Sequence, residues 1–88
     1  MMLVNVCDEE LLGETLRGAN VEMHISRDYF GGELVNEDTA LNLVKSSHIA
    51  NLVGDRIVSM VLEAKLASEF AVKRIGKVAF LMIFKFQR

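Results

Sequence analysis

Cys7 and Asp8 are the first residues whose types could do chemistry, since a thiol beside an acid is a possible nucleophile. A cysteine becomes reactive when a cation or a histidine lowers the pKa of its thiol. The neighbours that follow Cys7 are Asp8, Glu9 and Glu10, and carboxylates raise that pKa instead. We therefore expect Cys7 to be a structural residue, as most free cysteines are.

His24 and His48 are the two side chains suited to proton transfer near neutral pH. His24 lies beside Glu22 on the polar side of an alternating segment, so we expect it to be exposed. His48 follows a predicted helix, where an imidazole can interact with the last carbonyl groups. Two histidines without a short ligand spacing do not predict a metal site, and no motif implies a cofactor.

The loop between residues 28 and 33 is the most interesting candidate for binding. It combines two acids, two aromatic residues and a diglycine, and glycine lets a backbone approach a partner closely. The alternative is that Phe30 fills the core and the glycines only make the turn. The candidate binding residues here are Asp28, Tyr29, Gly31, Gly32 and Glu33.

Asn51 is a second candidate, because it precedes a predicted helix whose N-terminus could receive an anion. The sequence contains no glycine-rich phosphate loop or G-x-G-x-x-G run. The alternative role of Asn51 is a buried side chain that bonds to neighbouring backbone.

The charges are distributed unevenly along the chain. Residues 1–72 contain twelve acids and five bases, whereas residues 73–88 contain five bases and no acid. Lys73, Arg74 and Lys77 surround a predicted turn and could meet RNA phosphates. Alternation along a strand would place Lys73 and Arg74 on opposite faces, and the bases could equally pair with the acidic remainder of the fold.

Length and composition predict a single domain over residues 1–88. One cysteine excludes an internal disulfide. No signal peptide pattern opens the chain, and its longest apolar run is far below the roughly 20 residues of a membrane-spanning helix. We therefore expect a cytoplasmic protein without a membrane partner.

The hydropathy pattern predicts an α+β fold: a small mixed sheet with two main helices and a C-terminal hairpin. We expect strands over residues 1–7 and 21–25, with a loop over 26–32. Asn36 is a suitable N-cap for a helix over 37–46. A second helix, capped by Asp55, is expected over 56–66. Residues 71–75 and 78–86 form the hairpin around Gly76-Lys77.

The last predicted strand is apolar on both faces as far as Phe84, and Lys85 is its first interruption. Such a strand must be buried on both sides or covered by another chain. The rest of an 88-residue chain looks too small to cover both faces. We therefore expect pairing with a second copy, edge to edge or face to face. The candidate interface residues are Phe80, Leu81, Met82, Ile83 and Phe84.

Four segments of the sequence together resemble the archaeal family known as domain of unknown function 424. They are Val6–Gly13, Tyr29–Val35, Ile49–Gly54 and Val72–Gly76, in the order and spacing of that family. The resemblance implies a small stand-alone α+β protein of the archaeal cytoplasm, without an established enzymatic activity. Where the family tends to have a Pro-His pair, this chain has Ala79-Phe80.

These patterns favour a non-catalytic binding or adaptor protein, acting as a homo-oligomer or within a larger assembly. Its partner would be a second copy or an unidentified protein. The first alternative is an RNA- or ribosome-associated factor that uses the basic C-terminal segment. The second alternative, and the least favoured of the three functions, is a small-molecule enzyme using Asp28, Glu33 or His24.

Overall fold

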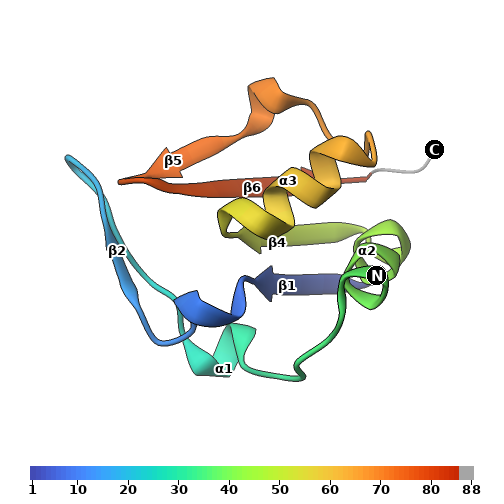
Figure 1. Ribbon diagram of the computed structural model, residues 1–88, viewed down its shortest axis with the longest axis horizontal. Coiled ribbons are helices and arrows are strands. Elements are labelled where there is room, and N and C mark those ends of the chain that lie inside the picture. Colours follow the sequence, from blue (N-terminus) through green and yellow to red (C-terminus); the bar gives the residue numbers. More distant parts are fainter. Residues whose placement is uncertain (86–88) are drawn as a thin grey trace.

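The structure is a computed structural model that describes residues 1–85, and it has the mixed α+β architecture expected from the sequence (Figure 1). Its main sheet contains four strands in the order β1 (Leu3–Cys7), β4 (Ile49–Val53), β6 (Val78–Phe84) and β5 (Lys73–Ile75). Strands β2 (Thr15–Arg17) and β3 (Glu22–His24) form a separate antiparallel hairpin. The helices are α1 (Arg27–Phe30), α2 (Glu37–Ser46) and α3 (Asp55–Glu63), with single 3-10 turns η1 (Glu9–Leu11) and η2 (Glu69–Ala71).

β4 lies in the middle of the sheet, although the sequence pattern predicted no strand there. It pairs in parallel with β1 and antiparallel with β6. Ala50 and Leu52 are fully buried toward the helices, and Val53 is fully buried on the opposite face. The segment is short and Asn51 interrupts its apolar run, so its sequence pattern does not indicate a strand.

Helices α2 and α3 cover one face of the main sheet and form the larger core with it (Figure 1). α2 has the predicted bounds, and the Asn36 side chain caps it by accepting from the Thr39 N–H at 2.8 Å. α3 ends at Glu63, three residues earlier than predicted. Among the apolar residues of the two cores, Ile25, Val44, Ile57, Val58 and Val61 are buried, and Met23, Leu41, Leu62 and Phe80 are partly buried.

β6 lies between β4 and β5, so the expected edge-to-edge pairing of this strand with a second copy is wrong. Leu81 and Ile83 are buried in the core beneath the helices and cannot form an interface in the folded chain. The predicted end of the strand, Phe86, lies outside the described residues, as does Arg88 of the basic segment.

The β2–β3 hairpin and α1 cover one half of the opposite face through a second core. Leu16, Ile25 and Val53 are its buried members, and Phe30 and Phe80 pack against them. The predicted loop over 26–32 contains α1, whose N-cap Ser26 accepts from the Asp28 N–H. Val21, the first residue of the strand expected over 21–25, lies outside β3 and is exposed.

The other half of that face carries exposed apolar side chains. The strand register places Leu3 beside Ile49 and Phe84, and Asn5 beside Asn51 and Met82. Met82 is 41% exposed and Phe84 is 50% exposed. We call this region the open sheet face; its residues are Leu3, Asn5, Ile49, Asn51, Met82 and Phe84.

Candidate functional site

A groove of about 790 Å³ runs along the β1 edge of the main sheet. Its walls come from β1 and the turn after it, from the segment before α2, from α2 itself, and from the first turns of α3. Residues 31–36, which we call the crossing loop, connect α1 to α2 past this edge (Figure 1). The volume lies within the range of about 300–1,000 Å³ that is typical of ligand sites.

The crossing loop and the end of α1 bring most of the predicted binding loop into the groove. Tyr29, Gly31, Gly32 and Glu33 line it, whereas Asp28 does not. A side chain at Gly31 would overlap with the Arg27 carbonyl oxygen, so this glycine is required by the turn after α1. Gly32 has open space around it.

Two apolar side chains of this region stay in solvent. Tyr29 is 73% exposed and Leu34 is 78% exposed, and both line the groove. The neighbouring Phe30 packs against the second core, which agrees with the alternative interpretation of the loop, in which Phe30 fills the core. The fold therefore uses Phe30, whereas Tyr29 and Leu34 have no comparable packing role.

The N-terminus of α3, at one end of the groove, is capped by Asp8 from the end of β1. The Asp8 carboxylate accepts from the N–H groups of Arg56 at 2.9 Å and Ile57 at 3.0 Å. Asp8 is buried, and Gly54 comes so close that any side chain there would overlap with the Asp8 carboxyl group. Asp55, the predicted cap, accepts instead from the Ala79 N–H at 2.9 Å.

This cap also corrects the proposed anion site near Asn51. A helix N-terminus attracts negative charge through its unpaired N–H groups. At α3 that charge comes from the chain itself, because Asp8 occupies the position that a bound anion would take.

Cys7 lies next to this cap, at the end of β1. Burial raises the pKa of the Cys7 thiol, and the charges of Asp8 and Glu10 raise it further. The expectation that neighbouring acids raise this pKa is confirmed. Since the thiolate is the reactive form, the environment of Cys7 opposes nucleophilic chemistry at neutral pH.

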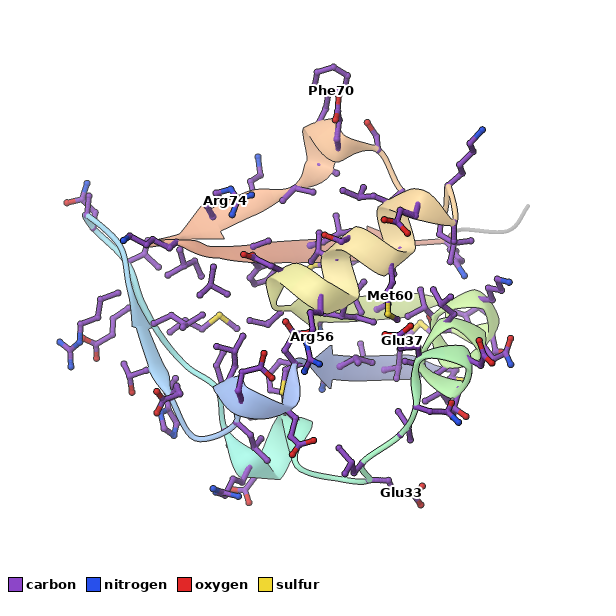
Figure 2. The ribbon with its side chains drawn as sticks, viewed as in Figure 1. Glu33, Glu37, Arg56, Met60, Phe70 and Arg74 are labelled. Atoms are coloured by element: carbon purple, nitrogen blue, oxygen red, sulfur yellow. The ribbon has the colours of Figure 1, made fainter. Side chains whose placement is uncertain are left out.

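The charged side chains around the groove are mainly acidic. Glu9, Glu33 and Glu37 line it and are exposed. The guanidinium of Arg56 lies 2.7 Å from the Glu10 carboxylate. In Figure 2 Arg56 and Glu37 lie on the side of the sheet where β1 runs, whereas Glu33 extends away from it.

The remaining candidates lie outside the groove. Asn51 Nδ2 donates to Asn5 Oδ1 at 2.8 Å on the open sheet face, so its expected bond to backbone is wrong. Arg74 Nη1 lies 3.7 Å from Asp55 Oδ1 and donates to the Lys77 carbonyl at 3.3 Å. The register puts Lys73 on the opposite face from Arg74, as predicted, so the structure does not gather these bases into one patch.

The histidines are also away from the groove. His24 is exposed, as predicted, and its Nδ1 lies 3.0 Å from Thr15 Oγ1. His48 Nδ1 accepts from the Met2 N–H, so its expected interaction with the end of α2 is wrong. Lys85 takes that place, because its Nζ donates to the carbonyls of Val44 and Lys45 at 2.6 and 2.9 Å. Residues 40 positions apart along the chain provide no local pattern that predicts this contact.

Among residues 1–85, no three His, Cys, Asp or Glu side chains lie together in a way that could hold a metal ion. Within the same range, each helix is too short or too polar to cross a membrane.

Comparisons with known proteins identify the family. A model of the family "Protein of unknown function (DUF424)" matches residues 1–86, so the chain belongs to that family and the resemblance found in its motifs is confirmed. The fold is similar to the crystal structure of an uncharacterized conserved protein from the archaeon Methanopyrus kandleri, with a TM-score of 0.71 and 24% identity. That alignment covers 100% of this chain and 88% of the other. No curated protein matches the chain.

Proposed function

We propose that this member of the DUF424 family is a non-catalytic binding module that holds a partner in the groove along β1. One observation carries the proposal: the groove is bordered by Tyr29 and Leu34, which are exposed although both are large and apolar. Exposed apolar groups that gather beside a concave surface are typical of interaction sites. An aromatic residue at the mouth of a groove is also a frequent anchor in protein interfaces.

A role in binding, rather than catalysis, is supported by how the reactive side chains are used. The Asp8 carboxylate caps α3 with both oxygens, and the raised pKa of Cys7 keeps its thiol protonated. His24 and His48 bond to other parts of the chain outside the groove. General acid–base catalysis needs such groups within reach of one substrate.

Site-specific photocrosslinking in cells tests the proposal. Tyr29→p-benzoylphenylalanine places the crosslinker at the groove, and Phe70→p-benzoylphenylalanine is the matched control. Phe70 is 89% exposed in η2, at the far end of the molecule from the crossing loop (Figure 2). We expect a specific crosslinked protein from position 29 that is absent from position 70.

Equal products from both positions, or none from position 29, would contradict a binding site in the groove. An RNA product would support the RNA-associated alternative instead. Mass spectrometry of the crosslinked species separates these outcomes.

We also propose that the chain self-associates through the open sheet face. Leu3, Met82 and Phe84 are exposed there, and none of the six described residues that define this face is charged, so two copies can meet there without repulsion between like charges among them. A two-fold contact is the commonest closed arrangement for a small protein. The groove is a poorer surface for self-contact, because its exposed charges are mostly acidic.

Light scattering at micromolar concentration tests this association. We expect at least twice the chain mass of 9.8 kDa for the natural sequence and the monomer mass for Met82→Lys. Phe70→Lys adds the same charge at an exposed residue elsewhere and should stay associated. A monomeric natural chain would contradict the proposal, as would an oligomer unaffected by Met82→Lys.

A further inference from the structure

We propose that the partner segment in the groove is an extended basic peptide that adds to β1 as a fifth strand of the main sheet. This inference rests on the proposed function and specifies the chemistry of its ligand. β1 is at one end of the strand order β1-β4-β6-β5, so one of its sides is available for pairing. Addition of a strand to a sheet edge is a common way to bind an extended peptide.

The backbone of β1 presents hydrogen-bonding groups to the groove. The Met2 carbonyl accepts from the N–H groups of His48 and Ile49, and the Asp8 N–H donates to the Val53 carbonyl. The backbone groups of Met2 and Asp8 therefore point toward β4. Backbone direction alternates along a strand, which turns Asn5 and Cys7 the opposite way. Both residues line the groove, so their N–H and C=O groups face the space where a peptide would lie.

The sequence of β1 lacks the features that usually prevent pairing at an edge. Natural edges are protected by short strands, prolines or charged residues, lysine above all. β1 has five residues, Leu3–Cys7, with neither a charge nor a proline. β5, the opposite edge, has three residues and carries Lys73 and Arg74.

The side chains around the groove define what the peptide should contain. Val4, Val6 and the α3 residues Ile57 and Met60 provide an apolar wall for every second side chain of an added strand. Exposed carboxylates of Glu9, Glu33 and Glu37 favour Lys or Arg at other positions. A second copy at this edge would bring these acids together, so the charge pattern favours a basic partner.

The experiment uses a fluorescent hexapeptide of alternating lysine and valine, with blocked ends. Two further peptides have N-methyl groups on the backbone nitrogens of either all lysines or all valines. In an added strand only one of these two sets donates to β1. We expect one methylated peptide to lose at least tenfold in affinity and the other to bind like the parent.

The protein side has its own matched pair. Cys7→Pro removes the N–H that faces the groove, whereas Cys7→Val changes the side chain and keeps that donor. We expect a loss of affinity in Cys7→Pro alone. Amide hydrogen exchange by NMR provides a measurement that needs no variant, since the bound parent peptide should slow exchange at Asn5 and Cys7.

Equal binding of both methylated peptides, or no binding at millimolar peptide, would overturn strand addition. Protection of Asn5 and Cys7 in a peptide-free dimer would assign the edge to a second copy and would also overturn it. If position 29 still crosslinks a protein while the peptide leaves these amides unprotected, the groove remains a binding site but the ligand does not add as a strand.

Discussion

The two edges of the main sheet are built in different ways. β5 has three residues, two of them basic, and Arg74 beside Asp55 forms an exposed ion pair. β1 has five uncharged residues, borders the groove, and continues into Asp8, which is buried against the start of α3. Charge protects the β5 edge from further pairing, whereas the β1 edge is anchored to the core through Asp8 and has neither a charge nor a proline.

Gly54→Ala should produce the largest loss of stability, because it disturbs the anchor of β1 twice. Gly54 has a φ of +123°, which is unfavourable for other residues, and a side chain there would displace the Asp8 carboxylate. Backbone strain of about 1–3 kcal/mol and the lost cap together predict a cost of about 4 kcal/mol in the free energy of unfolding. Urea denaturation provides the measurement.

Gly32→Ala is the matched control, because the space around Gly32 is open. Its stability should stay within about 0.5 kcal/mol of the natural sequence. Similar losses of stability in the two glycine variants would contradict the close approach of Gly54 to the Asp8 carboxylate.

Asp8→Ala should have the next largest effect. It removes both acceptors of the α3 cap and leaves the N–H groups of Arg56 and Ile57 without their carboxylate partner. Hydrogen bonds to a charged group contribute about 1.5–3 kcal/mol each, and we expect a total loss of about 3 kcal/mol. Glu9→Ala, at an exposed neighbour, should cost less than about 0.5 kcal/mol, and equal losses would refute the cap.

Arg74→Ala, at the β5 edge, should lower the free energy of unfolding far less than Asp8→Ala, at the end of β1. The ion pair with Asp55 is 3.7 Å long, and both side chains are mostly exposed. Exposed pairs contribute about 0–1 kcal/mol, and salt screens them further. A loss near 3 kcal/mol in the same urea experiment would mean that the β5 edge is anchored as strongly as β1.

Cys7→Val should change how the free energy of unfolding depends on pH, and only under alkaline conditions. At neutral pH the thiol is protonated, so its ionisation contributes nothing that the substitution could remove. The pKa of the folded thiol is raised, so the folded chain keeps its proton where the unfolded chain loses it. Stability should therefore fall as pH rises above about 8.5, the ordinary thiol pKa. Cys7→Val should lack this part of the decline, and identical pH profiles of unfolding would contradict the burial of Cys7.

The sequence alone determined the elements whose signals are local. The Asn36 cap and the apolar stripe of α2 lie within eleven residues, and the predicted bounds of that helix are confirmed. The turn at Gly76-Lys77 is confirmed for the same reason, since a hairpin pairs neighbouring segments. The loop over residues 28–33 was selected by its composition, and all of its residues except Asp28 line the groove.

Only the tertiary structure decided which distant residues meet. Asp8 caps a helix 48 positions away and Lys85 reaches carbonyls 40 positions away, so neither contact leaves a periodic pattern in the sequence. Strand order has the same origin: the apolar run predicts that β6 needs cover, but the whole fold decides that β4 and β5 pair with both of its edges. The two cores cover Phe80, Leu81 and Ile83, whereas Met82 and Phe84 stay exposed. β1 is therefore an edge strand because the packing of the whole fold determines which strands pair.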